Sequence, residues 1–435
     1  MHHEYVDELF QFIKKSPSCF HAIDTIKKEL AQNGFEELSE SNAWKLAPGK
    51  QYFVTRNLSS IIAFKLPEKD FSSFHIVASH SDSPTFKIKE GAEVEVEKKY
   101  IQLNTEGYGG MICSTWFDRP LSIAGRVLVR DGSGVKTQLL NIDRDLVMIP
   151  NLAIHLNRDI NKGYTYNAQV DMLPLYGDVS SKDSFKQLIA KEAGVAPEDL
   201  LGSDLFLYNR MDGTCWGANN EYISCPQLDD LECAFTSLKA FLAGSSASAS
   251  VYCVFDNEEV GSGTKQGAKS TFLTDVLHRI NRGLGRSEED YHRTIASSFM
   301  LSADNAHALH PNHPNKFDKT NRVFMNEGIV IKHSANQKYC TDSVSAAVFK
   351  NICNKAEVPC QEFANRSDMV GGSTLGNLSN AQVSLNAVDI GLAQLAMHSC
   401  YETAGAQDVA IMVRGITAFY NSAVESTADG QYVIG

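Results

Sequence analysis

The sequence predicts an α/β fold in two domains, one of which is inserted into the other. Its 435 residues exceed the ~250–300 residues at which single cores stop growing. Amphipathic helices and short, continuously apolar strands occupy both ends of the chain, whereas the middle alternates apolar and polar residues. We therefore expect a discontinuous domain of residues 1–84 and 209–435, with helices on both faces of a mixed sheet. A β-rich domain of residues 85–208 interrupts it.

The helices are predicted from apolar residues at helical spacing. This spacing marks residues 6–13 and 23–30, and Gly34 ends the second helix. A further amphipathic helix begins near Asp229. The run Ser245–Ser250 is predicted to be the loop between that helix and the next strand.

Three buried strands are predicted, and a polar residue capable of chemistry follows each one. In parallel sheets, ligands gather beyond the carboxyl ends of the strands. We therefore expect these polar residues to converge on one site. The strands and the residues after them are Phe74–Ala78 with His80 and Asp82, Ser250–Phe255 with Glu258 and Glu259, and Phe299–Leu301 with Asp304.

The middle of the chain has the texture of an antiparallel sheet. Strict alternation appears in Val94-Glu95-Val96-Glu97. Residues 126–140 predict a hairpin whose turn is Asp131-Gly132-Ser133-Gly134.

Composition and charge exclude several classes of protein. The chain is 43% hydrophobic and 21% charged, which is typical of a globular protein. A net charge of −12 argues against a nucleic-acid partner. No run approaches the ~18 apolar residues of a membrane span, and the start lacks an export signal, so we expect a cytoplasmic protein without a membrane partner. The ten cysteines include no C-x-x-C pair, which favours free thiols.

The residues at the strand ends are suited to binding metal ions. Zinc accepts histidine nitrogen and carboxylate oxygen. In His80-Ser81-Asp82, the imidazole is placed to bind a metal while Asp82 holds its other N–H. The adjacent carboxylates of Glu258 and Glu259 resist joint ionisation unless a cation compensates them. One of them then suits a ligand and the other a general base.

Other histidines are harder to place. His307, His310 and His313 lie in a proline-containing run that predicts an irregular loop, and a substrate-lining role for His307 or His310 is favoured over metal binding. His398 lies in Leu392–Tyr401, which is predicted to be helical. Spacing alone does not decide its role.

Five runs of the sequence, in order, resemble the motifs of aspartyl aminopeptidases, which are tetrahedral, dodecameric di-zinc enzymes. The resemblance covers essentially the whole chain. It implies a di-zinc exopeptidase catalytic domain, an inserted dimerisation domain, and assembly into dimers and a dodecamer. The runs are Ser79–Pro84, Leu228–Leu231, Asp256–Ser262, Ser302–His307 and Ala396–Ser399.

The resemblance implies a ligand set for two divalent metal ions per subunit. Asp229 would bridge the two ions. His80 and Asp304 would complete one site, and Glu259 and His398 the other. Zn²⁺ is expected first, with Mn²⁺ or Co²⁺ as substitutes, because such ligands accept several divalent ions.

Three catalytic residues are also implied. Glu258 would be the general base, and Asp82 would support His80. His155 would reach the active site of the neighbouring subunit and stabilise the oxyanion. Together these residues predict metal-assisted hydrolysis of the first peptide bond of substrates with a free N-terminus.

The substrate pocket implied by the resemblance contains a lysine. Lys332 matches the position that meets an acidic first side chain, so Asp or Glu is the expected first residue. Tyr339, Gly372 and Ser373 match other pocket positions. His307 is a further residue expected to line the pocket, because it follows closely on Asp304.

Two departures and three alternatives accompany this interpretation. Asp230 stands where many relatives have Asn, and Val370-Gly371 replaces a Pro-Cys of some relatives. The same chemistry with a preference for neutral or apolar first residues is one alternative, and a catalytically idle assembly protein is another. Gly263–Ser270 nearly spells a P-loop, so a nucleotide-binding protein is the third, although Ala268 replaces the second glycine.

Overall fold

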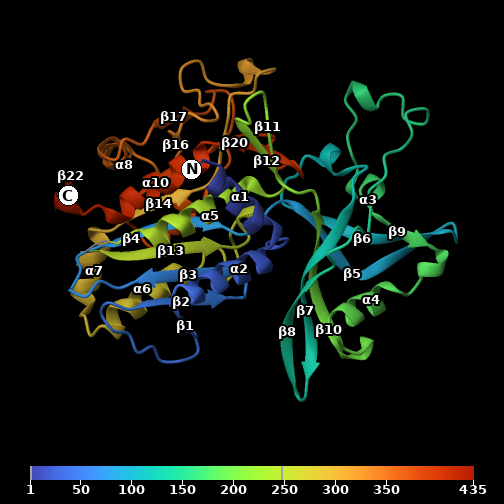
Figure 1. Cartoon of the computed structure of the whole chain (residues 1–435), viewed down its shortest axis with the longest axis horizontal. Helices are drawn as coiled ribbons and strands as arrows, with labels where there is room; N and C mark the ends of the chain where they lie inside the picture. The colour runs from blue at the N-terminus through green and yellow to red at the C-terminus, as the bar shows by residue number, and fades with distance from the viewer. Residues whose placement is uncertain (1, 246–247) are drawn as a thin grey trace.

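The computed structural model describes residues 2–245 and 248–435. The chain forms two lobes side by side, an α/β lobe and a β-rich lobe (Figure 1). Of the predicted loop Ser245–Ser250, residues 246 and 247 lie outside the described residues.

A nine-stranded mixed sheet forms the centre of the α/β lobe. Strands β13, β4, β14 and β18 are neighbours and run parallel, while β2, β3 and β16 each have an antiparallel neighbour. In sheet order the strands are β1 (Glu36–Leu38), β2 (Gln51–Arg56), β3 (Ser60–Lys65), β13 (Ala249–Phe255), β4 (Phe74–His80), β14 (Phe299–Ala303), β18 (Asn386–Gly391), β16 (Ile329–His333) and β17 (Cys360–Ala364).

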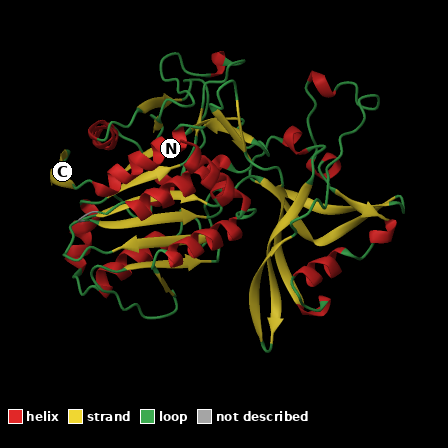
Figure 2. Ribbon diagram, viewed as in Figure 1, coloured by secondary structure: helices red, strands yellow, loops and turns green. Residues whose placement is uncertain are grey.

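Helices cover both faces of this sheet, as predicted (Figure 2). The central strands are continuously apolar because alternate residues enter different cores. Val77 belongs to the core to which α1, α2, α5, α8 and α10 contribute, and Ile76 to the core to which α6, α7 and α9 contribute. The helices are α1 (His2–Lys14), α2 (Cys19–Gln32), α5 (Leu228–Ala243), α6 (Phe272–Gly283), α7 (Glu288–Ala296), α8 (Ser343–Lys355), α9 (Leu375–Asn380) and α10 (Asp408–Asn421).

A five-stranded sheet lies at the edge of this lobe and corrects one prediction. Leu392–Tyr401 is not helical, because its first part pairs with neighbouring strands on both sides and its second part turns back. In that turn Ala396 and His398 have positive φ angles of 57° and 66°. The strands are β11 (Thr214–Trp216), β12 (Tyr222–Cys225), β20 (Glu402–Gly405), β19 (Ala393–Leu395) and β15 (Ala306–His307).

The β-rich lobe contains a six-stranded antiparallel sheet with its own apolar core. The predicted hairpin is confirmed, since Asp131 pairs with Gly134 across its turn. The sheet order is β8 (Gly134–Asn141), β7 (Leu121–Asp131), β10 (Leu200–Asn209), β5 (Thr85–Val96), β6 (Tyr100–Tyr108) and β9 (Leu175–Asp178), and the lobe adds α3 (Ala168–Asp171) and α4 (Phe185–Glu192). A separate hairpin, β21 (Val424–Ala428) and β22 (Gln431–Ile434), follows α10 near the C-terminus.

The ten cysteines are free thiols, as expected from the sequence. Cys233, Cys253 and Cys353 are buried. No helix in the described part of the chain is both long and apolar enough to cross a membrane.

His75 on β4 predicts a specific sensitivity to acid. Its ring is fully buried and stacks on Phe419 at 4.9 Å. Burial lowers its pKa to about 4, below the value of about 6.5 in an unfolded chain. The folded state therefore favours the neutral ring, and this stability is complete above about pH 6.5 and is lost as the pH falls towards 4.

We expect His75→Phe to keep the ring stacking and remove this loss. Between pH 7 and pH 5 the wild type should lose about 2 kcal/mol more unfolding free energy than the variant, measured by urea denaturation at both pH values. Exposed His292 on α7 provides the control, His292→Gln, which should follow the wild type. Parallel pH dependence of wild type and His75→Phe would contradict the prediction.

Candidate metal centre

The centre forms where three parallel strands end side by side. β4 lies between β13 and β14, with His80 opposite Phe255 and Ala78 opposite Ser302. The residues that follow these strands therefore reach the same edge of the sheet. A close approach at this edge requires glycine, since a Cβ on Gly391 of β18 would lie 1.9 Å from the carbonyl oxygen of Asp304.

All five residues expected to bind metal lie together at this edge. Their ligand atoms fall into three overlapping groups, and within each group they lie within 4.8 Å of one another. The groups are His80, Asp229, Asp230 and Asp304; His80, Glu258 and Glu259; and Asp229, Glu259 and His398. Asp230 is the one member that the sequence analysis did not propose as a ligand or base.

Asp229 lies between the two histidines. Its Oδ1 is 3.8 Å from Nε2 of His80, and its Oδ2 is 3.3 Å from Nε2 of His398. The same nitrogen of His398 is 3.4 Å from Oε2 of Glu259. One carboxylate therefore faces two histidines through different oxygens, which is the arrangement that a bridging ligand needs.

The side chains themselves indicate that cations belong here. Oδ1 of Asp229, Oδ1 of Asp230 and Oε1 of Glu259 are buried, and none of them has a hydrogen-bond partner within the described residues. Buried carboxylates without partners are costly unless a positive charge compensates them. Because carboxylate oxygen and imidazole nitrogen suit zinc and similar ions, the donor set fits divalent metals.

The pKa values of these side chains in the absence of ions reflect the same cost of burying carboxylates without a compensating charge. Burial, followed by the charge of Asp304, raises the pKa of Glu258 to about 8 against the opposing effect of His80. Burial also raises the pKa of Asp230 well above its usual value. For His398 burial acts downwards, but the hydrogen bond to Asp229 and the charge of Glu259 outweigh it and raise the pKa to about 10.

Asp82 contacts this centre at two places, whereas the sequence analysis expected only its support of His80. Nδ1 of His80 lies 3.0 Å from the backbone carbonyl oxygen of Asp82 and 3.4 Å from its carboxylate. The carboxylate accepts hydrogen bonds from the backbone amides of Glu258 and Glu259, both at 3.1 Å. Asp82 therefore positions His80 and also the turn that carries Glu258 and Glu259 (the acidic turn).

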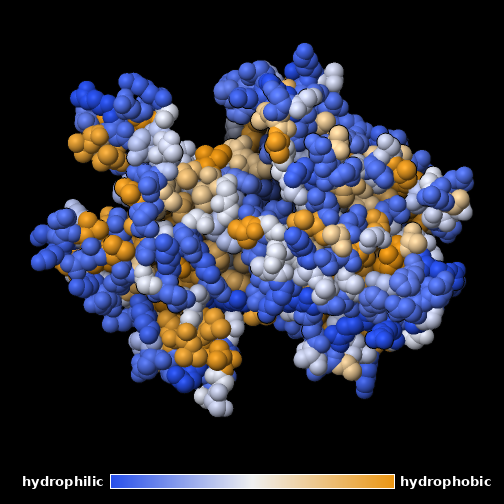
Figure 3. Space-filling view, turned by 180° about the vertical axis from the view of Figure 1, so that it is seen from behind, coloured by the Kyte–Doolittle hydropathy of each residue, from blue (hydrophilic) through white to orange (hydrophobic). Residues whose placement is uncertain are grey.

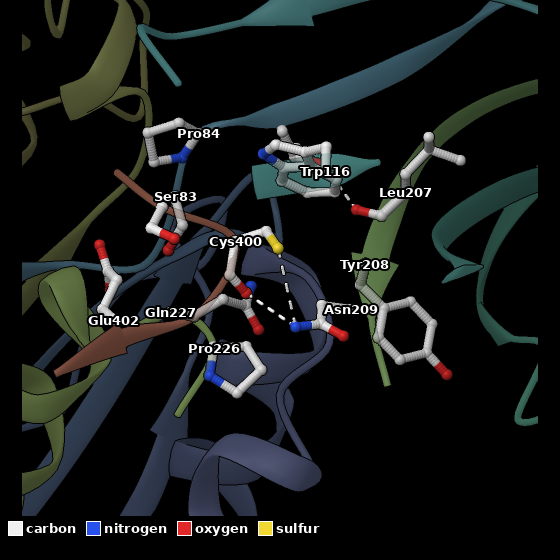
Figure 4. Close-up of a pocket in the computed structure, with 12 residues that line it drawn as sticks. Ser83, Pro84, Trp116, Leu207, Tyr208, Asn209, Pro226, Gln227, Cys400 and Glu402 are labelled. Carbon is white, nitrogen blue, oxygen red and sulfur yellow. Dashed lines mark hydrogen bonds between the residues drawn. The ribbon is translucent and has the colours of Figure 1, made fainter. Parts of the chain in front are cut away.

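Glu402 is a residue that the sequence analysis missed. Its carboxylate accepts hydrogen bonds from the backbone amides of Asp229 at 2.9 Å and His398 at 2.6 Å. It also lines a small cavity between the lobes, with Ser83 and Trp116 (Figure 4). The available signal was an acid four residues after His398, but the prediction of a helix over Leu392–Tyr401 gave this acid no role.

The side chain of Lys332 is buried. Its side chain is 2% exposed, and Nζ donates to the carbonyl oxygens of Asp304 at 2.7 Å and Asn305 at 3.2 Å. Nζ also lies 3.4 Å from the carboxylate of Asp304 and 5.3 Å from the centre of the Tyr339 ring. Its charge thus offsets one acid of the centre.

The other residues expected to line the substrate pocket are His307, Tyr339, Gly372 and Ser373. The ring of Phe363 is 6.5 Å from that of Tyr339 and 6.3 Å from that of His307. Gly372 and Ser373 lie in the exposed loop before α9, where the Ser373 hydroxyl donates to Asn377 at 3.0 Å. Tyr339 and His307 thus flank one aromatic ring, with the loop exposed to solvent.

Three features lie outside these groups. His155 is exposed in the segment between β8 and α3, and it belongs to none of the ligand groups described above. His310 and His313 contact each other in an irregular loop, with ring centres 4.9 Å apart. The P-loop-like run Gly263–Ser270 forms turns ahead of α6.

Comparison with known proteins gives a consistent result. The family described as "Aminopeptidase I zinc metalloprotease (M18)" matches residues 12–420. A probable M18 family aminopeptidase 2 of Clostridium acetobutylicum is 48% identical over 427 residues, covering 96% of this chain and 99% of that protein. The probable M18 family aminopeptidase 2 of Ectopseudomonas mendocina is 38% identical over 430 residues, covering 97% of this chain and 99% of that protein.

Solved structures show the same fold. Ape4, from a cryo-EM structure of its complex with Nbr1, matches with a TM-score of 0.93 and 34% identity over 96% of this chain and 86% of that chain. The S. cerevisiae mApe1 dodecamer matches with a TM-score of 0.83 and 27% identity over 95% of each chain. With a family match across most of its length and relatives alike from end to end, this chain belongs to the M18 family of zinc metalloproteases and is an aminopeptidase.

Proposed function

We propose that this aminopeptidase removes the first residue of peptides with a free N-terminus, preferring Asp or Glu, and that it uses two metal ions bridged by Asp229. The observation that carries the proposal is the position of Asp229, whose two oxygens face His80 and His398 separately. His80 and Asp304 complete one site, and Glu259 and His398 the other. Zinc is the expected metal, and manganese or cobalt suits the same ligands.

Glu258 is the general base in this proposal. Bound at these ligands, the two cations supply Lewis acidity towards the scissile carbonyl and towards water. The Glu258 carboxylate accepts a proton from the attacking water and later donates it to the departing amine. Asp82 fixes the Glu258 backbone through the amide hydrogen bond at 3.1 Å, and this contact orients the base.

The preference for an acidic first residue rests on Lys332. An ammonium group has three protons, and two of them go to the carbonyl oxygens of Asp304 and Asn305. We assign the third to the carboxylate of an acidic first residue of the substrate. A buried charge-assisted hydrogen bond favours Asp and Glu over neutral residues.

Self-assembly is supported by the segment between β8 and α3. It carries exposed apolar side chains, among them Leu156 at 75% and Leu152 at 59% exposure. Figure 3 shows apolar residues on the projecting arm at upper left. Such surface is typical of a protein interface, and mApe1 of S. cerevisiae is a dodecamer. In a dimer formed through this lobe, His155 reaches the partner's metal centre and donates to the oxyanion. A cytoplasmic location stays a prediction.

Removal of the base should separate chemistry from metal binding. Glu258→Gln keeps the side-chain shape but cannot accept the proton, so kcat should fall at least ~100-fold while the zinc content of the protein stays at the wild-type level. Glu289→Gln, on the exposed face of α7, is the control and should keep full activity. Chelation should abolish wild-type activity, and zinc or manganese should restore it. A variant with more than a tenth of wild-type kcat would refute Glu258 as the base.

Substrate preference can be measured on peptides that begin with Asp, Glu, Leu or acetyl-Asp. Asp and Glu should be released fastest, and acetyl-Asp should not be released. Lys332→Met should lower the ratio of kcat/KM for Asp to that for Leu by roughly 10- to 100-fold, since a hydrogen bond to a charged group is lost. The ratio is its own control, because general damage lowers both values. An unchanged ratio would show that Lys332 does not set the preference, whereas faster release of Leu by the wild type would make the neutral preference the better description.

Mixed dimers test whether His155 acts on the partner subunit. His155→Gln and Glu258→Gln should each be inactive alone. Together they should regain about a quarter of wild-type activity, because half of randomly paired dimers then contain one complete site out of two. No recovery, with mixed dimers demonstrated by differently tagged chains, would show that His155 works within its own chain or not at all.

A further inference from the structure

One segment of the β-rich lobe runs along the metal centre of its own chain. Strand β6 ends at Tyr108, and the next residues lie against Glu259 and the His398 turn before β7 begins. Residues 108–112 contact both turns through separate hydrogen bonds. This contact is distinct from any role of the lobe in assembly.

Tyr108 reaches the acidic turn through Asp82. Its hydroxyl donates to Oδ2 of Asp82 at 2.7 Å and accepts from Nδ2 of Asn257 at 2.8 Å. The Asp82 carboxylate in turn accepts the backbone amides of Glu258 and Glu259. The tyrosine therefore fixes the Asp82 carboxylate, which holds the backbone amides of the proposed base Glu258 and the proposed ligand Glu259.

Gly109 brings the backbone against Glu259. Its φ of +72° is in the left-handed region, and a Cβ at this position would lie 3.1 Å from the Cβ of Glu259. The main chain thus packs directly on a proposed ligand. A side chain here would have to displace it.

The next residues hold the His398 turn. Nδ1 of His398 donates to the carbonyl oxygen of Gly110 at 2.7 Å, and the Ile112 amide donates to the carbonyl oxygen of His398 at 2.9 Å. With its proton on Nδ1, the ring presents the Nε2 lone pair towards Asp229 and Glu259. A carbonyl partner of this kind sets the tautomer that a metal ligand needs.

The same lobe also holds Cys400, two residues further on. The Cys400 amide donates to the Thr115 hydroxyl at 3.0 Å, and Nδ2 of Asn209 donates to the Cys400 carbonyl oxygen at 2.9 Å (Figure 4). The turn that carries His398 is therefore held mainly by residues of the β-rich lobe. This explains how a turn with two residues at positive φ keeps one geometry.

We propose that Tyr108–Ile112 is a positioning element of the metal centre: it orients Asp82, Glu259 and His398 of its own chain, so that the inserted lobe is part of the active site as well as of the assembly. The inference rests on the proposed metal centre. Tyr108 is a positioning residue in this scheme and does not touch the substrate.

Tyr108→Phe tests the inference with the smallest change. It removes the hydrogen bond to Asp82 and keeps the ring contact with Phe206, whose centre is 5.5 Å away. We expect kcat and zinc affinity to fall about 10-fold or more, as for other residues that orient metal ligands, with KM within about twofold. Tyr176→Phe is the matched control, because its hydroxyl bonds Ser184 elsewhere in the same lobe. It should behave as wild type.

Gly109→Ala provides a second test. Gly194→Ala is its control, since Gly194 has a similar φ of +69° but nothing within 4 Å of an added Cβ. The backbone strain is then shared by the two variants, and only Gly109→Ala should change zinc affinity and the visible spectrum of the cobalt-loaded protein. Zinc affinity is measured by competition with a chelator, and size-exclusion chromatography and melting of the metal-free protein report on assembly and folding.

Wild-type zinc affinity and kcat in Tyr108→Phe would overturn the inference, as would equal losses in each variant and its control. Failure of the proposed function is a different result. In that case chelated wild type or Glu258→Gln stays active. If those two lose activity while Tyr108→Phe and Gly109→Ala do not, the metal centre stands and only the positioning role is wrong.

Discussion

Mutual repulsion among buried carboxylates is the constraint on which this structure depends. Asp229 lies within 4.8 Å of Asp230 and Asp304 in one group of ligand atoms and of Glu259 in another. Burial raises the pKa of Asp304 and strongly raises those of Asp230 and Glu259. Two histidines and Lys332 supply only part of the compensating charge. A fold keeps such a cluster when cations are its partners, which agrees with the description of the family as zinc metalloproteases.

The sheet provides the rigidity that the cluster needs. Parallel strands β13, β4 and β14 fix the spacing of the residues that follow them, and packing on both faces prevents the strands from shifting. Asp229 and His398 lie outside these strand ends, at the start of α5 and in the β19–β20 turn. The carboxylate of Glu402 accepts a hydrogen bond from the backbone amide of each, so one side chain fixes their relative position.

The parts of this fold that depend on local pattern were predictable from the sequence. Strand β4 and the residues after it follow from a short apolar run that ends in His80 and Asp82. The His398 turn was predicted wrongly as helix, because its geometry depends on pairing with β20 and on contacts with residues about 285 positions earlier, such as Thr115. The burial of Lys332 against Asp304 likewise depends on tertiary structure alone. The resemblance supplied the ligand roles, which spacing left open.

The order of the ligands along the chain has a consequence for biosynthesis. His80 leaves the ribosome early, Asp229 follows after the whole inserted lobe, and His398 is among the last 40 or so residues of the 435-residue chain. The proposed second site, which includes Asp229, Glu259 and His398, can therefore form only after the inserted lobe has been synthesised. In the proposed scheme a chain that has been synthesised only as far as the inserted lobe has one ligand, His80, and no complete site, so it should not hydrolyse peptides.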